Sequence, residues 1–304
     1  MIRYILHKEI DKQRWDSCIE QSVNRLPYAY AWWLDIVSPG WEALVQDDYI
    51  AIMPLNRNRK LGIDYLFQPY LTQQLGVFSP DAKTPEETGR FLAAIPAKYS
   101  FIDIQLNTMN DPVNAGFHFK ARMNYTLNLT PAYLQLSAHY HRNCRRNIQK
   151  AIYTGLKVKP GPGPSVFTRF IERNLDKKVS EIRKNLYPVL QRITNASIQN
   201  GTGEILGVYK RSGDLLAAGW FVTGAGRCLF EVCASTREGK ENKAMYMLVD
   251  HVIREKSESG LIFDFTGSNI PGVAYFNAGF GASKSTYLAA KRNLLPWPLK
   301  VFKK

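Results

Sequence analysis

The sequence predicts an α+β protein whose helices and sheets are divided into two domains. Strand-like apolar runs alternate with segments of helical periodicity, and both halves begin with helices and continue into sheet. A length of 304 residues is sufficient for two domains. We place the boundary at Thr130-Pro131, which gives an N-terminal domain at 1–130 and a C-terminal domain at 131–304.

The N-terminal half is expected to alternate short strands with helices. Trp15, Cys18 and Ile19 recur at helical spacing. Thr84 is a good N-cap residue, and Pro85 and two acidic residues follow it in the first turn of a helix. The expected strands are 2–9, 41–54, 63–67, 101–106 and 117–129, the expected helices are 11–24, 28–38 and 84–97, and 56–60 is expected to be a basic turn.

The C-terminal half is expected to contain a basic helix, a helical region and a strand–helix–strand core. The basic helix runs from 134 to 153, and a Pro-Gly turn separates it from the helical region at 166–199, which breaks near 184–188. The core at 215–281 contains two apolar strands, a loop at 237–244, an amphipathic helix, a buried strand and a short helix, and a last strand follows near 285–291. A strand that leads into a helix N-terminus is a layout that holds phosphate-bearing ligands.

Composition indicates the class of partner and the compartment. A formal net charge of +14 favours anionic partners such as CoA phosphates, tRNA or an anionic membrane surface, although solvated surface charge explains it equally well. We find no signal-peptide pattern, no uncharged apolar run that could span a bilayer, and no metal or redox spacing among the cysteines and histidines. A cytoplasmic protein without a metal site is expected.

Three short segments and the order of elements at 215–281 carry a family resemblance. The segments are the basic His139–Ala151, Phe263–Ser268 with Asp264 between phenylalanines, and Tyr275–Gly281. In their order and spacing these segments resemble those of proteins with the acyl-CoA N-acyltransferase (GNAT) fold, and most of all its two-domain FemAB-like branch. The resemblance implies two tandem GNAT-like domains, each a mixed, mostly antiparallel sheet flanked by helices. It also implies that the C-terminal domain binds the donor and that the acceptor lies on the N-terminal side.

The resemblance also implies an N-acyltransferase. Such an enzyme would move an acyl or aminoacyl group from a thioester, such as acyl-CoA, or from aminoacyl-tRNA to an amine on a small molecule or cell-wall precursor. It would hold no permanently bound cofactor. Two alternatives remain open: a binding or scaffold protein on this fold with a decayed site, and a nucleic-acid binder that uses the basic helix.

The expected donor-binding residues lie in two places. In the loop after the second strand of the core, backbone N–H groups of GNAT enzymes hold the CoA pyrophosphate. The matching loop departs from the family pattern, because its second glycine is missing and two acids are present; Asn242 is read there as an N-cap. Arginines of the basic helix could add bidentate hydrogen bonds to phosphates. The candidates are Arg237, Gly239, Asn242, Lys243, Ala244, Arg145 and Arg146.

Three residues are candidates for catalysis, each with a structural alternative. Tyr275 corresponds to a GNAT tyrosine that protonates the leaving thiolate, and it could instead pack on the sheet. Asn277 replaces the lysine of FemAB-like enzymes and can donate a neutral hydrogen bond without supplying charge. Glu231, within an apolar strand, is the best-placed general base, although it could lie on an exposed face. Asp264 is expected to be a structural residue that caps backbone N–H groups.

Aromatic and amide side chains are concentrated in the N-terminal half. They resemble the corresponding half of FemAB-like proteins and could line an acceptor cleft, whereas ordinary core packing is the alternative, above all for Trp33. The acceptor candidates are Tyr28, Tyr30, Gln68 and Tyr70.

Overall fold

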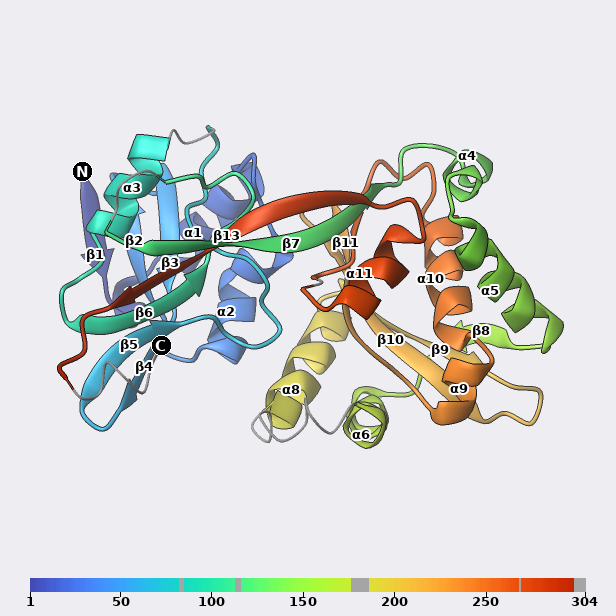
Figure 1. Cartoon of the computed structure of the whole chain (residues 1–304). Coiled ribbons are helices and arrows are strands. Elements are labelled where there is room, and N and C mark those ends of the chain that lie inside the picture. Colours follow the sequence, from blue (N-terminus) through green and yellow to red (C-terminus); the bar gives the residue numbers. More distant parts are fainter. Residues whose placement is uncertain (82–84, 113–115, 176–185, 268, 298–304) are drawn as a thin grey trace. The chain divides into compact units, whose positions relative to one another are not determined.

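The computed structural model describes residues 1–81, 85–112, 116–175, 186–267 and 269–297. The chain divides into two compact units (Figure 1). Unit 1 contains Met1–Met123 together with the chain from Thr286, and unit 2 contains Asn124–Ser285. Thr130-Pro131, the boundary expected from the sequence, lies within unit 2.

Unit 1 contains two sheets. The first has the order β1-β2-β3 and is antiparallel, and the second contains the run β4-β5-β6-β13, in which only β5 and β6 are parallel. Its elements are β1 (Ile2–Ile5), α1 (Lys12–Gln21), α2 (Ala31–Val37), β2 (Glu42–Gln46), β3 (Ala51–Leu55), β4 (Arg57–Lys60), β5 (Ile63–Phe67), α3 (Pro85–Ala93), β6 (Tyr99–Gln105), the start of β7 (His118–Asn128) and the end of β13 (Ser283–Asn293).

Unit 2 is built on a sheet with the strand order β7-β12-β11-β10-β9-β8. Only β11 and β12 are parallel. Its elements after β7 are α4 (Tyr133–Ala138), α5 (Arg142–Tyr153), β8 (Lys157–Pro160), α6 (Pro164–Asn174), α8 (Leu186–Gln199), β9 (Gly203–Tyr209), β10 (Leu215–Gly224), β11 (Arg227–Ser235), α9 (Arg237–Glu241), α10 (Ala244–Glu255), β12 (Ile262–Asp264) and α11 (Pro271–Ala278).

Helices cover both faces of the unit 2 sheet. Trp220 donates its indole N–H to Ser197 Oγ of α8 at 3.1 Å, whereas a Cβ on Gly219 would lie 3.1 Å from Leu248 Cδ2 of α10. Because adjacent residues of a strand point to opposite faces, α8 and α10 lie on different sides of β10. α5 packs against α10, and α6 packs against α8 (Figure 1). One buried core of this unit contains residues of α5, α10 and the sheet.

One topological pattern recurs in both units. In each, an antiparallel hairpin is followed by helical chain and a strand parallel to the second hairpin strand: β4-β5, α3 and β6 in unit 1, and β10-β11, α9-α10 and β12 in unit 2. An antiparallel strand from elsewhere in the chain then pairs with the parallel one, β13 with β6 and β7 with β12. The expected mixed, mostly antiparallel sheets flanked by helices are confirmed.

Several elements differ from those expected. The segment 56–60 is mostly strand β4 because its backbone pairs with β5, from Arg57 with Leu66 to Lys60 with Ile63. The basic helix is two helices, α4 and α5, interrupted where His141 N–H donates to Gly279 O at 2.9 Å. The strand expected at 41–54 is the hairpin β2-β3. The N-cap expected at Thr84 and the start of the expected break at 184–185 lie outside the described residues.

Candidate functional site

β11 and β12 diverge after a short parallel pairing. The register matches Arg227 with Ile262 and ends where Leu229 matches Asp264. Beyond this point β11 continues to Ser235 with β10 as its partner, whereas Phe265 N–H donates to Tyr125 O of β7 at 3.0 Å. We call this place the divergence point. It leaves the backbone of β11 after Leu229 without a neighbouring strand on its β12 side among the described residues.

A β-bulge lies at the divergence point. Trp220 of β10 pairs with Val232, and Phe221 pairs with Phe230, so Glu231 is inserted as an extra residue in β11. Bulges turn a side chain and a peptide group out of the regular ladder, and they are common beside active sites. Glu231 is half-buried, and its Oε1 oxygen is inaccessible to solvent. The structure therefore places a partly desolvated carboxylate where the parallel strands separate.

The turn after β12 is held by buried side chains. Asp264, 1% exposed, accepts hydrogen bonds from Arg227 Nη1 at 3.1 Å, Asn124 Nδ2 at 2.9 Å and Thr266 N at 2.9 Å. Gly267 N–H donates to Asn124 Oδ1 at 3.0 Å. Burial raises the pKa of Asp264, while the Arg227 charge and these hydrogen bonds act in the opposite direction. The expected structural role of Asp264 is thus visible in its contacts.

Tyr275 and Asn277 lie on α11 in different environments. Tyr275 is 59% exposed. Asn277 is 2% exposed and donates from Nδ2 to Gly267 O at 3.1 Å. The amide of Asn277 is therefore joined to the turn after β12, whereas the phenol of Tyr275 reaches solvent.

The expected phosphate loop is largely helical. Thr236 caps α9 by accepting from Gly239 N at 3.0 Å. Asn242 is the C-cap of α9, and Lys243, in the left-handed region with φ of 60°, is the N-cap of α10. The expectation that Asn242 is an N-cap is therefore wrong, because the extra helix shifts the start of α10. Gly239 packs closely on β10, since a Cβ there would lie 2.2 Å from Leu216 O.

The charges of this segment are partly neutralised. Glu238 pairs with Lys210 at 3.1 Å, and Glu241 pairs with the exposed Arg237 at 3.1 Å. The first turn of α10 has no side-chain cap, and the buried Ala244 begins it. Uncapped N–H groups and a positive helix end can bind an anion. Glu238 and Glu241, the two acids that argue against a phosphate ligand, each lie beside a cation.

Arg145 and Arg146 are exposed on α5. Arg145 Nη1 donates to Ala138 O at 3.2 Å, and Arg146 Nη2 donates to Asn143 Oδ1 at 2.9 Å. The opposite face of the helix is buried through Cys144, Ile148 and Ala151. No ion pair joins α5 to an acidic residue of the described chain, so its outer face keeps its positive charge.

The acceptor candidates of unit 1 differ in accessibility. Tyr28 is 1% exposed and packs edge-on against Trp33. Tyr30 is half-buried and hydrogen-bonded to Glu20, and burial raises its pKa. Gln68 Nε2 donates to Thr72 O at 2.8 Å, and Gln68 Oε1 accepts from Gln105 N at 2.8 Å. Tyr70 is 42% exposed, so among the three tyrosines it has the ring most accessible to a ligand.

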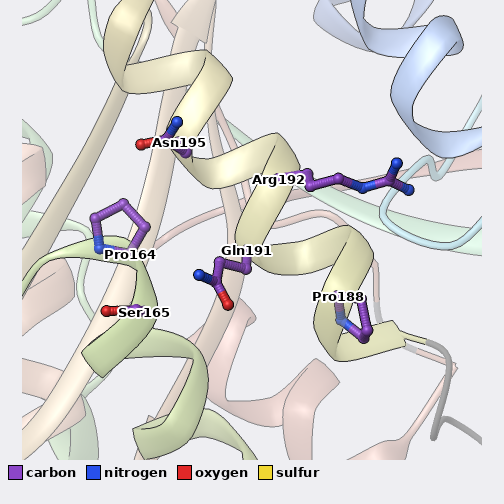
Figure 2. Close-up of a pocket in the computed structure, with 6 residues that line it drawn as sticks. All are labelled: Pro164, Ser165, Pro188, Gln191, Arg192 and Asn195. Carbon is purple, nitrogen blue, oxygen red and sulfur yellow. The ribbon is translucent and has the colours of Figure 1, made fainter.

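A separate cavity of about 580 Å³ lies between α6 and α8. Figure 2 shows Pro164 and Ser165 at the start of α6 beside Gln191 and Asn195 of α8, while the Arg192 side chain points away from them. Pro188 completes the lining. None of these residues belongs to the divergence point.

Three of the four cysteines are not activated. Burial raises the pKa of Cys144 and Cys233 to about 12 and the pKa of Cys228 to about 11. The thiols therefore stay protonated at neutral pH and are poor nucleophiles. Within the described residues, no cluster of His, Cys, Asp and Glu could hold a metal ion. No helix in the same part of the chain combines the length and apolarity that crossing a membrane requires.

Solved structures with the same arrangement of helices and strands align with this chain over nearly its whole length. FemX superposes with a TM-score of 0.69 at 14% identity and covers 99% of each chain. The protein has a FemAB/GNAT-like fold. L-PGS from Bacillus licheniformis gives a TM-score of 0.56 at 12% identity over 96% of this chain and 94% of that one. A GNAT-family acetyltransferase from Colwellia psychrerythraea gives 0.53 at 13% identity over 96% and 98%.

These likenesses concern the fold, which agrees with the resemblance drawn from sequence. No protein-family model matches the chain, and no curated protein matches it in sequence. Within the FemAB/GNAT-like fold, Thr266 contacts Asp264 and Phe230, the neighbour of Glu231, and Gly267 contacts the Asn277 amide, all at the place where β12 separates from β11.

Sequence reasoning missed two members of this group. Asn124 and Arg227 make direct contact with Asp264, yet neither belongs to a recognisable motif. A weak signal existed for Arg227, which is a charged residue at the start of an apolar strand. Asn124 carries no such signal, because its role depends on the pairing of β7 with β12.

Proposed function

We propose that this protein is an acyltransferase that moves an acyl or aminoacyl group from a thioester or a tRNA ester to an amine, with the donor carbonyl at the divergence point. The observation that carries the proposal is the bulge at Glu231, which lies beside the backbone that β12 leaves uncovered. Such a place offers both oriented N–H groups and a carboxylate to a reacting carbonyl. The FemAB/GNAT-like fold supports this reaction class.

The chemistry assigns a role to each group. The amine nitrogen attacks the acyl carbonyl carbon, a C–N bond forms, and the C–S or C–O bond to the carrier breaks. Backbone N–H groups of β11 would stabilise the negative charge that develops on the carbonyl oxygen. Glu231 would take the proton that the amine loses, and Tyr275 would supply a proton to the leaving thiolate or alkoxide. Exchange with water then restores both side chains.

The α10 end is the proposed site for the phosphates of a CoA donor. The uncapped first turn of α10 begins shortly after β11 ends, and Lys243 lies at its start. Lys240 and Arg237 are exposed nearby in sequence. Phosphate groups at a helix N-terminus gain from both the free N–H groups and the helix dipole.

A second observation favours aminoacyl-tRNA among the two donors. The stretch 112–171 contains no Asp or Glu, whereas it contains Lys120, Arg122, Arg142, Arg145, Arg146, Lys150, Lys157, Lys159 and Arg169. On α5, Arg142, Arg146 and Tyr153 follow one another at helical spacing and are exposed, with Tyr153 at 86%. Arginines can bind backbone phosphates, and an exposed aromatic ring can stack on a base.

Thermal unfolding with candidate donors tests the proposal. Acetyl-CoA, palmitoyl-CoA, aminoacyl-tRNA and deacylated tRNA are added separately at low and high salt. We expect one donor class to raise the Tm and to keep part of that effect at high salt, because a ligand that binds the folded state stabilises it. Equal, salt-sensitive shifts with charged and deacylated tRNA would indicate a plain nucleic-acid binder. No shift with any donor would indicate a scaffold protein and overturn the proposal.

A further inference from the structure

We propose that Asn124, Asp264 and Asn277 are positioning residues, which hold the turn Thr266–Gly267 beside the bulge of β11 and so fix where a donor carbonyl binds. This inference rests on the proposed function, since it concerns the same divergence point. It assigns to Asn277 a role that differs from direct contact with substrate. It also adds Asn124, which no sequence motif indicates.

The turn adopts a backbone conformation that needs support. Thr266 has φ of 49° and Gly267 has φ of 117°. A β-branched residue in the left-handed region is unfavourable, and such residues persist only where their surroundings fix them. Glycine tolerates the second position because it has no Cβ. The turn is therefore a place where side-chain contacts, rather than local preference, determine the path of the chain.

Two asparagines hold Gly267 from different elements. Asn124 of β7 accepts from Gly267 N–H at 3.0 Å, and Asn277 of α11 donates to Gly267 O at 3.1 Å. Both asparagines are nearly inaccessible to solvent, with 1% and 2% exposure. Removing either one leaves a peptide group of the turn without that buried partner, which is costly.

Asp264 connects the turn to the strands on both sides. Its carboxylate accepts from Arg227 of β11, from Asn124 of β7 and from the Thr266 backbone N–H. Three donors converge on two oxygens, so an amide at this position would have to direct its NH₂ at one of them. Arg227 supplies the opposite charge that a buried carboxylate needs.

The same turn is connected directly to the bulge. Thr266 Oγ1 donates to Phe230 O at 2.5 Å, and Phe230 immediately precedes the inserted Glu231. This contact replaces the ladder bond that β12 would make if it continued beside β11. A shift of the turn therefore acts on the peptide group that joins Phe230 to Glu231. The carbonyl of this peptide group faces the turn and its N–H points away from it, so the contact fixes the path of β11 at the bulge and thereby the neighbouring N–H groups that would face the donor carbonyl.

The test uses three variants and a matched control. Asp264→Asn keeps the shape of the side chain and removes its charge and one acceptor. Asn124→Ala and Asn277→Ala each remove one partner of Gly267. The control is Asp250→Asn, because Asp250 is also a buried acid of unit 2, 5% exposed, and accepts from Tyr133 Oη on α4 at 2.9 Å. It reports the effect of losing a buried carboxylate elsewhere in the same unit.

Amide hydrogen exchange of the ligand-free protein measures the positioning itself. In Asp264→Asn, Asn124→Ala and Asn277→Ala we expect the amides of Thr266, Gly267 and Glu231 to lose protection by roughly tenfold or more beyond any change of the β9 and β10 amides. In Asp250→Asn any loss should be shared across unit 2. Unchanged protection of Thr266 and Gly267 in all three variants would overturn the inference, whatever the protein binds.

Kinetics with the donor that stabilises the wild type then separate positioning from folding. We expect Asp264→Asn to lower kcat roughly 10- to 100-fold while donor Kd changes less than about threefold, because small misplacement of a reacting group costs rate more than affinity. Asp250→Asn should retain kcat. A full kcat in Asp264→Asn would overturn the inference. If no donor stabilises the wild type and the wild type transfers no acyl group, the proposed function is wrong instead. The exchange data still test whether these three residues hold the turn.

Discussion

Asn124 and Asp264 are 140 positions apart in the sequence, and a 2.9 Å hydrogen bond joins Asn124 Nδ2 to Asp264 Oδ1. The register of β7 with β12 places Thr126 opposite Asp264. Asn124 lies two residues along β7, on the same face, and is therefore the diagonal neighbour of Asp264. Diagonal neighbours on adjacent strands are within reach of polar side chains, so a single register decides whether this contact exists.

The buried carboxylate predicts a specific pH dependence. Burial raises the pKa of Asp264 in the folded state above the unfolded value of about 3.9. A carboxyl with a raised pKa contributes most stability below its unfolded pKa, and this contribution is lost as pH rises through the folded pKa. Urea unfolding should show the free energy of unfolding of the wild type falling, relative to Asp264→Asn, as pH rises from about 3.9. A constant or rising difference would contradict the raised pKa.

Gly239→Ala should destabilise unit 2 through a steric clash. A Cβ at this position would lie 2.2 Å from Leu216 O, so α9 must move from β10. We expect a loss of about 1–3 kcal/mol in the free energy of unfolding, measured by denaturant titration. Gly272→Ala is the control, because nothing lies within 4 Å of a Cβ there. An unchanged stability with weaker CoA binding would instead support contact between Gly239 and the donor.

Glu231→Gln tests the general base. If Glu231 takes the amine proton, kcat/KM should fall by roughly 10²–10⁴-fold, and the acidic limb of its pH profile should disappear. The matched control is Glu204→Gln on β9, whose exposed carboxylate pairs with Lys256 at 3.9 Å. Activity of Glu231→Gln within about twofold of the control would exclude Glu231 as the base.

The outer face of α5 predicts a change in salt dependence. Replacing both Arg142 and Arg146 with Glu should weaken tRNA binding and reduce the slope of log K against log salt by about one for each phosphate that the helix no longer binds. Fluorescence anisotropy over a salt series measures this slope. Arg169→Glu on α6, an exposed site in the same acid-free stretch, makes one such charge change on another helix. Equal slopes in wild type and the double variant would rule out α5 as a phosphate-binding face.

Local patterns predicted most of the elements, because each depends on neighbours in the sequence. The hairpin β10-β11 and the helix α10 follow from apolar runs, a Gly turn and helical periodicity over a few residues. The split at His141 and the strand β4 were not predictable in this way. The first depends on a hydrogen bond to Gly279 and the second on pairing with β5.

The candidate site was likewise predictable from the sequence only in part. Sequence indicated Glu231, Asp264, Tyr275 and Asn277 as residues of interest, and the resemblance to FemAB-like proteins indicated the fold. The sequence could not show that Glu231 is the inserted residue of a bulge, because a bulge is defined only by the register of the partner strand.

The sequence by itself determined the basic charge and most of the helices and strands, since periodicity and residue type carry that information locally, and its resemblance to FemAB-like proteins indicated the fold. Only the tertiary structure decided that Asn124 and Arg227 meet Asp264, and that Asn277 holds Gly267. The physical reason is that a buried polar group must find its partner in space. Strand register and helix packing across the whole unit, rather than the neighbouring residues, determine which partner that is.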